Sequence, residues 1–352
     1  MKTNILIFIF VCITSRALFA EGGRLNDMPL FQSQEPLELT LVADIVAIRS
    51  DKSDDPEYTP AMLLQHFDTY INKGFDIKIK ARGNTRRLSG LCDFPPLKFN
   101  FKKGQVKNTV FEGQDKLKFV SQCRQEESFQ NYVLEEYLLY QTYHIITPVS
   151  YRTRLVNITI KDYKLRVPTI TMTGFLIEDD ESLAKRIDAR PYEQKLFSQD
   201  SCESTAVDRL SMFQYMIGNT DYYIHTLHNT DIFELKHSGE LIPVPFDFDF
   251  AGVINTPYAS PSRQIPITQV RQRYFKGSCR DEQAYNPILE LFNSKKAEIF
   301  ALYNRFDYLP KTVIKKSLRY YGKFYKIIND PESVEESFYS VCNAPLYLEP
   351  RK

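Results

Sequence analysis

Two short polar segments carry the residues best suited to chemistry. The first reads "IGNTDYYIHTLHN" and contains Asp221, two histidines and Asn229, and the second, "PVPFDFDFAG", contains Asp247 and Asp249. An aspartate that accepts a hydroxyl proton, a downstream asparagine that binds a metal and a further aspartate after a strand are the working parts of phosphoryl transfer. Mg²⁺ favours such hard oxygen ligands. The pattern predicts Asp221 as the catalytic residue. It predicts Asp247, Asn229 and Asp249 as metal ligands.

Plainer interpretations of the same residues stay open. Asn, Thr and Asp are ordinary turn residues, so Asp221 could simply cap a turn. Asp247 and Asp249 would share one face of an alternating strand, opposite phenylalanines, as on an amphipathic edge strand. His225 and His228 lack a third ligand nearby for a metal site, although His225 could serve as the general base in place of Asp221.

The elements around the two segments must bring them together. The stretch "STAVDRLSMFQYMIG" has helical periodicity and leads directly into the first segment. The stretch "NTDIFELKHSGELIPVPFDFDF" predicts a short hairpin with "HSGE" as its turn. Because a hairpin folds its strands side by side, it would place Asn229 close to Asp247. Further helices are predicted over residues 181–189, 286–306 and 311–329.

The first half of the chain alternates apolar and polar residues and is rich in β-formers. It predicts a loop over 50–60 and strands over 37–48, 75–83, 92–103 and 115–123. From Ser128 to Tyr143 the period becomes helical, and "YRTRLVNITI" and "TITMTGFLIED" then predict an antiparallel pair. The whole pattern predicts an α+β chain with a flexible lead-in (21–35), a strand-rich lobe (36–180) and a helical lobe (181–352).

The order of four pieces resembles the CotH-like (spore-coat H) family of secreted atypical kinases, a branch of the protein-kinase-like superfamily. The pieces are "RGNTRR", "CDFPPLKFNF", the helix "ESFQNYVLEEYLLYQTYHIITPVS" with the strands and connector after it, and the two polar segments. The resemblance covers roughly residues 36–255. It implies a two-lobed, protein-kinase-like fold with a strand-rich N-lobe and a helical C-lobe, and with ATP and Mg²⁺ between them.

The resemblance also implies a phosphate-binding lysine. Lys98 would hold the nucleotide phosphates and would be steadied by a glutamate of the helix. Glu136 is favoured over Glu135 for this pairing because apolar residues share its helix face. By its own pattern, Lys98 alternates with Phe99 and Phe101, and so could equally face solvent.

The chain departs from the kinase pattern at two points. The Gly-rich loop that covers the nucleotide is missing, and Arg82, Gly83 and Asn84, with Arg86, would do its work through backbone N–H groups and guanidinium forks. The asparagine of a kinase catalytic loop follows the aspartate by five residues, whereas Asn229 follows by eight.

The resemblance implies Mg²⁺-dependent transfer of the ATP γ-phosphoryl group to a hydroxyl of a protein or a small molecule. The alternative is a non-catalytic, pseudokinase-like module for binding or envelope assembly, because ATP is scarce outside a cell and the Gly-rich loop is missing. A hydrolase that uses the paired acids would need a nucleophile motif, which the sequence lacks.

The N-terminus predicts export. "MKTNILIFIFVCITSRALFA" has one lysine, a short apolar run and then small residues, as in a signal peptide cleaved after residue 20. The chain would be secreted or periplasmic. Phe10 and Val11 before Cys12 fit a lipoprotein signal poorly. No later apolar run is long enough to span a membrane.

The bulk composition is that of a globular protein, with 43% hydrophobic and 25% charged residues. A formal net charge of +1 gives no support for binding of nucleic acid. Five cysteines follow the signal segment, and their pairing stays open: Cys92, Cys123, Cys202, Cys279 and Cys342. The absence of any CxxC motif argues against a zinc site.

Overall fold

The computed structural model describes residues 28–67, 72–83, 85–88, 90–194, 198–262 and 265–340. The predicted signal peptide, Asn84 and Cys342 lie outside these residues. Part of the predicted flexible lead-in lies inside them. There, Pro29–Phe31 form a short 3-10 helix (η1) whose Leu30 is fully buried, so this part of the lead-in packs against the fold.

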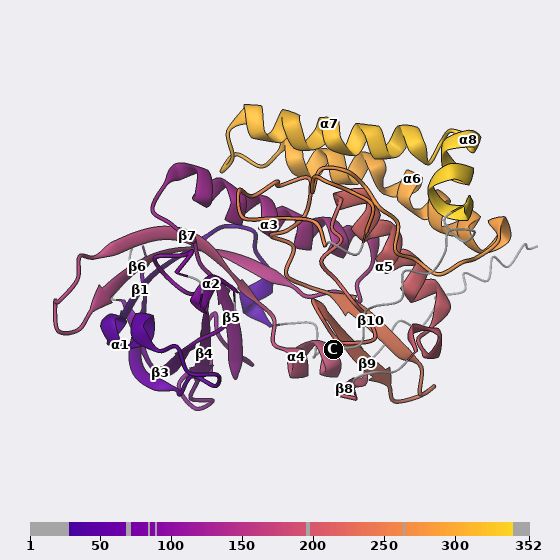
Figure 1. Cartoon of the computed structure of the whole chain (residues 1–352). Coiled ribbons are helices and arrows are strands. Elements are labelled where there is room, and N and C mark those ends of the chain that lie inside the picture. The colour runs from indigo at the N-terminus through magenta and orange to yellow at the C-terminus, as the bar shows by residue number, and fades with distance from the viewer. Residues whose placement is uncertain are drawn as a thin grey trace, which may run out of the picture.

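Seven strands close into a barrel, seen at one end of the molecule in Figure 1. Their order around it is β1 (Leu37–Ala43), β2 (Thr59–Gln65), β3 (Lys73–Ala81), β4 (Leu97–Phe101), β5 (Lys116–Val120), β7 (Ile170–Ile177) and β6 (Thr153–Asp162). All neighbours are antiparallel except β1 and β6, which are parallel. The alternation in β3 puts Phe75, Ile77 and Ile79 into the barrel core. The predicted antiparallel pair is confirmed as β6 and β7.

Two of the sequence predictions need correction in this barrel. The strand predicted over 37–48 ends at Ala43, because the Asp44 side chain accepts a hydrogen bond from the Ala47 amide and starts helix α1 (Ile45–Ser50). The loop predicted over 50–60 ends where β2 begins at Thr59. Pro60 had favoured a loop, yet it lies near the start of its strand, where a proline is tolerated.

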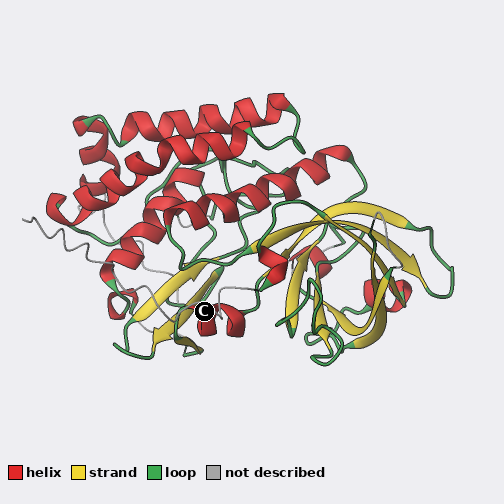
Figure 2. Cartoon of the chain, turned by 180° about the vertical axis from the view of Figure 1, so that it is seen from behind, coloured by secondary structure: helices red, strands yellow, loops and turns green. Residues whose placement is uncertain are grey.

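The second half is mainly helical, as predicted, so the chain is α+β (Figure 2). Its helices are α4 (Asp180–Arg186), α5 (Ser204–Ile217), α6 (Glu282–Asn304), α7 (Lys311–Ile327) and α8 (Pro331–Val334), followed by a π-helical turn, Glu335–Tyr339. The predicted hairpin is confirmed as β9 (Thr230–Leu235) and β10 (Leu241–Pro245). A short strand that the sequence analysis missed, β8 (Ala189–Tyr192), adds to its edge.

Helix α3 (Glu127–Ile146) joins the two halves. Its Tyr140 ring contacts Phe175 of β7 with 5.5 Å between centroids, and its Tyr137 ring stacks on Phe306 after α6 at 5.9 Å. The helix is buried among the barrel and the helices α5, α6 and α7, which share one hydrophobic core with it. Side chains on α3 can therefore contact residues of both halves.

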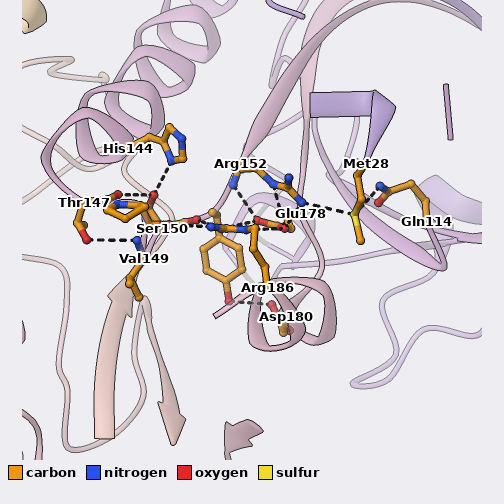
Figure 3. A network of polar contacts seen from close by, with 12 residues as sticks. Met28, Gln114, His144, Thr147, Val149, Ser150, Arg152, Glu178, Asp180 and Arg186 are labelled. Carbon is orange, nitrogen blue, oxygen red and sulfur yellow. Dashed lines mark hydrogen bonds and ion pairs between the residues drawn. The ribbon is translucent and has the colours of Figure 1, made fainter. Parts of the chain in front are cut away.

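The connector between the halves is held by buried charges (Figure 3). Glu178, directly after β7, is fully buried and pairs with Arg152 at 2.6 Å and with Arg186 at 2.9 Å. Arg186 also donates to the carbonyl oxygens of Pro148 and Ser150. Two cations and two carbonyls thus fix the chain where it leaves the barrel and enters α4.

Covalent bonds add to this framework. Cys92 and Cys123 form a disulfide, Cys279 is also disulfide-bonded, and Cys202 is a buried free thiol.

Within the described ranges, no helix combines the length and apolar character needed to cross a membrane.

Candidate functional site

The loop that carries Asp221 begins at the end of α5. Gly218 ends the helix in the left-handed conformation, with φ of 70°, which glycine adopts at no steric cost. The Asn219 side chain then accepts a hydrogen bond from the Asp221 amide at 3.0 Å. Tyr223 and His228 pair as an isolated antiparallel bridge, and the chain between them turns back on itself.

This small turn explains how Asn229 reaches Asp221 across eight residues. The side-chain nitrogen of Asn229, Nδ2, donates to the backbone carbonyl oxygen of Asp221 at 2.8 Å and to the Asp221 side-chain oxygen Oδ2 at 3.0 Å. The additional residues form the turn between Tyr223 and His228 and leave the two ends of the loop in contact. The longer spacing is therefore compatible with the convergence that phosphoryl transfer needs.

The second polar segment meets the first at the same place. The Phe246 amide donates to the Asn229 carbonyl oxygen at 3.0 Å. Strand β10 ends at Pro245, so Asp247 and Asp249 lie in a turn and not on an edge strand. Asp247 has a φ of 59°, and its amide donates to the Tyr140 hydroxyl of α3 at 2.9 Å. This kink leaves the Asp247 side chain 43% exposed, while the Asp249 side chain is 9% exposed.

A cavity of about 270 Å³ lies where the barrel meets the two segments. From the barrel side come Arg82, Gly83, Arg86, Pro96 and Val120, and from the other side Asp221, His228, Asn229, Phe246, Asp247, Asp249 and Phe250. Seven residues that the sequence analysis named for the site thus line one space: Arg82, Gly83, Arg86, Asp221, Asn229, Asp247 and Asp249. Lys98 and Glu136 do not line it.

Among the described residues that line the cavity, Arg82 is a positively charged one without an acidic partner. Among the described residues its guanidinium makes no ion pair, and its buried Nε makes no hydrogen bond. The other lining cations, Arg86 and His228, already contact carboxylates. Because this guanidinium lines the cavity without an acidic partner among the described residues, the arrangement favours an anionic ligand at Arg82.

Arg86 forms the central ion network of the site. Its Nη2 lies 2.7 Å from Asp249 Oδ2, 3.2 Å from Glu136 Oε2 and 4.0 Å from Asp247 Oδ1. The Arg86 side chain is 11% exposed. Glu136, predicted as the partner of Lys98, thus pairs with Arg86 instead.

Burial shifts the acids around Arg86. It raises the pKa of Glu136 to about 8 and that of Asp249 to about 6, and the nearby guanidinium opposes both shifts. Tyr258 also interacts with the Asp249 carboxyl. Since Asp249 is buried and held by Arg86, Asp247 is the more accessible carboxylate for a ligand.

Lys98 lies elsewhere. It stands on the outer face of β4, because Leu97 and Phe99 on either side of it are buried in the barrel core. Its Nζ is 3.6 Å from Asp179 Oδ1 in the connector. The predicted pairing of Lys98 with Glu136 is wrong, since the alternation of the strand turns the lysine toward the connector.

The sequence analysis missed the role of His228. Its Nε2 lies 2.9 Å from Asp221 Oδ1, and this hydrogen bond raises the pKa of His228. Because Asn229 donates a hydrogen bond to Oδ2, both carboxylate oxygens of Asp221 accept a hydrogen bond, and the carboxylate is held in one orientation. His225 stacks edge-on against Tyr223, and it does not line the cavity. Asp221 and His228 lie in a loop and not in a helix, so only the turn closed by the Tyr223–His228 bridge brings them into contact.

The donor set suits magnesium better than zinc. Across the part of the chain that the structure describes, no group of three or more His, Cys, Asp and Glu side chains is placed to hold a metal ion. Mg²⁺ keeps several waters and often takes only one or two carboxylates. The exposed carboxylate of Asp247 lines the same cavity as Asn229, and such a small set of oxygen ligands fits that chemistry.

Comparison with known proteins gives a distant likeness. No family model matches the chain, and neither does any curated protein. Among solved structures, the chain is similar to the Helicobacter pylori proinflammatory kinase CtkA, with a TM-score of 0.38 and 9% sequence identity over 70% of this chain and 98% of that chain. At this TM-score, the likeness says nothing of activity, substrate or site residues.

Proposed function

We propose that this chain is an exported, kinase-like phosphotransferase that moves the γ-phosphoryl group of ATP to a hydroxyl of a protein or small molecule. The observation that carries the proposal is the composition of the 270 Å³ cavity. An unpaired guanidinium, Arg82, lines it together with an exposed carboxylate, Asp247, and the hydrogen-bonded pair of Asp221 and Asn229. A metal–phosphate ligand needs anion and cation ligands within one space, and this cavity supplies both.

Each residue has a part in the proposed reaction. Arg82 and the backbone at Gly83 would bind phosphate oxygens. Asp247 and the Asn229 amide oxygen would hold Mg²⁺, which neutralises phosphate charge when bound. Arg86 would keep Asp249 and Glu136 in place. Lys98, held by Asp179, takes no part in phosphate binding in this proposal.

Asp221 would act on the acceptor. Both of its oxygens accept one hydrogen bond, and each carboxylate oxygen has a second lone pair to accept the acceptor hydroxyl. The hydroxyl oxygen forms a bond to the γ-phosphorus, the bond to the β–γ bridging oxygen breaks, and the hydroxyl proton passes to Asp221. The products are a phosphate ester and ADP.

The first prediction concerns nucleotide binding and turnover. Mg-ATP at 100 times its dissociation constant should stabilise the protein by about 2.7 kcal/mol in a thermal-shift measurement. Asp247→Asn should abolish that stabilisation and the transfer of labelled γ-phosphate, because it removes the accessible carboxylate. Asp307→Asn, which changes an exposed surface pair with Lys311, is the matched control and should behave as wild type. Equal turnover by wild type and Asp247→Asn would refute the proposal.

A second candidate function is a non-catalytic binding module. It is favoured by Arg86, whose guanidinium is already paired with Asp249 and Glu136, and by the missing Gly-rich loop. Asp221→Asn separates the two functions. A kinase would retain Mg-ATP stabilisation in this variant and lose transfer, whereas a binding module would show stabilisation and no transfer in wild type as well.

A further inference from the structure

The segment between β10 and α6 runs along the end of α5 and the Asp221 loop. The Gly252 and Val253 amides donate to the carbonyl oxygens of Gly218 and Ile217 at 2.9 and 3.0 Å. Farther on, Arg273 donates to the carbonyl oxygens that end α5, those of Tyr215 and Met216. This segment thus satisfies the backbone of the helix end that leads into the loop.

Lys276 continues this pattern into the loop itself. Its Nζ donates to the Thr220 carbonyl oxygen at 3.0 Å and to the Tyr222 carbonyl oxygen at 2.6 Å. These are the two carbonyls on either side of Asp221. One ammonium group therefore holds the backbone before and after the proposed catalytic residue.

A stack of rings links Lys276 to the Asp221 carboxylate by a second route. The ammonium lies 3.5 Å from the centroid of the Tyr223 ring and 4.7 Å from that of Tyr222. The Tyr223 ring in turn contacts the His228 ring at 6.0 Å between centroids, and His228 donates to Asp221. Backbone and side chain of Asp221 are thus both oriented from the side of Lys276.

We propose that Lys276 is a positioning residue for Asp221, fixing the loop so that the carboxylate meets the acceptor hydroxyl. The role rests on the proposed phosphoryl transfer, and it involves no contact between Lys276 and either substrate. A lysine suits the position because an ammonium offers three donors without a fixed plane, and two carbonyls on one turn need converging, charge-assisted bonds.

The test compares Lys276→Met, which keeps most of the side-chain bulk, with Lys311→Met at an exposed surface pair as the control. Lys276→Met should lower kcat about 100-fold and leave the KM for ATP unchanged, because displacement of a reacting group by about 1 Å has that effect on rate. In Lys276→Ala, added ethylammonium ion should restore part of kcat, while ethanol should not. Wild-type kcat in Lys276→Met, or loss of Mg-ATP binding together with kcat, would overturn the proposal.

A second measurement does not depend on activity. Amide hydrogen exchange followed by mass spectrometry should become faster over residues 220–229 in Lys276→Met, while strands β3 and β4 of the barrel keep their wild-type protection. Unchanged exchange over the loop would refute the positioning role. If wild type transfers no phosphate but the loop exchange responds, the proposed function fails and the role of Lys276 in holding the loop stands.

Discussion

At the residue scale, Arg86 controls the charges of the candidate site. It lies between Glu136, Asp249 and Asp247, all within 4.0 Å of its Nη2. Buried carboxylates without such a partner are unfavourable, because the low-dielectric interior disfavours the ionised form. Arg86 therefore stabilises the fold at the same point at which it holds Asp249 next to Asp247, the residue proposed to bind the metal.

Replacing Arg86 with methionine should cost about 3 kcal/mol or more in the free energy of unfolding, because the buried Asp249 loses its counter-charge and Glu136 loses a hydrogen-bond donor. Urea unfolding at neutral pH measures the loss. The matched control is Arg190→Met, which removes an exposed pair with Glu234 and should cost less than about 1 kcal/mol. An equal effect of the two substitutions would show that the network around Arg86 adds nothing.

At the element scale, α3 carries two neighbouring buried glutamates with different partners. Glu136 contacts Arg86 on the cavity side. Glu135 accepts a hydrogen bond from Ser317 of α7 at 2.9 Å, with no ion pair among the described residues. Burial raises the pKa of Glu135 to about 8, and the hydrogen bond from Ser317 opposes this only in part. Burial therefore raises the pKa of both glutamates to about 8, and the shift is opposed by the Arg86 guanidinium at Glu136 and by the Ser317 hydroxyl at Glu135.

The raised pKa of Glu135 predicts a pH dependence of stability. Between the usual carboxyl value of 4.5 and about 8, the folded chain keeps a proton that the unfolded chain has lost. The free energy of unfolding should therefore fall as pH rises through this window, by up to about 1.4 kcal/mol per pH unit from this group.

Glu135→Gln should remove that contribution, so that the difference in stability between the variant and wild type grows with pH and levels off above about 8. Denaturant unfolding at several pH values measures the difference. Glu298→Gln, at an exposed pair with Lys295, should show no such trend. A pH-independent difference for Glu135→Gln would mean that Glu135 is ionised in the folded chain.

At the scale of the whole molecule, long-range bonds hold the barrel and the helical part around the cavity. The connector is fixed by Glu178 with Arg152 and Arg186. The disulfide between Cys92 and Cys123 joins the segment after the short helix α2 (Thr85–Leu88), which carries Arg86, to the chain just before α3. Cys123 also lines a small space beside Arg86, Glu136 and Asp249. Stability and site geometry therefore depend on the same cross-link.

Replacing both Cys92 and Cys123 with serine should lower the free energy of unfolding by about 2–4 kcal/mol, because the bridge closes a loop with a sequence separation of 31 and restricts the unfolded chain. Denaturant unfolding measures the loss without reductant. Full reduction serves as the control, since it should decrease the difference in the free energy of unfolding between wild type and the double variant. Equal free energies of unfolding for wild type and the double variant without reductant would show that this bridge contributes nothing to stability.

The sequence by itself determined the local elements and the two polar segments. Helical periodicity located α3, α5, α6 and α7, and alternation located most barrel strands, because these patterns depend on neighbours within one element. The hairpin that brings Asn229 close to Asp247 could also be predicted, because its turn depends on residues that are adjacent in the sequence. Strand β2 and the short β8 were missed, since Pro60 and Pro191 obscure the alternation that their sheet positions nevertheless tolerate.

Only the tertiary structure decided which charges meet. Arg86 and Glu136 are 50 residues apart, and Lys276 lies more than 50 residues from the carbonyls it holds. No periodicity relates such residues, because their contacts depend on how β-barrel, α3 and the segment before α6 pack together. The alternation of β4 already turns Lys98 away from the barrel core, but its partner Asp179 follows from how the connector packs against the barrel. Local pattern thus pointed to the candidate residues, and packing assigned their partners.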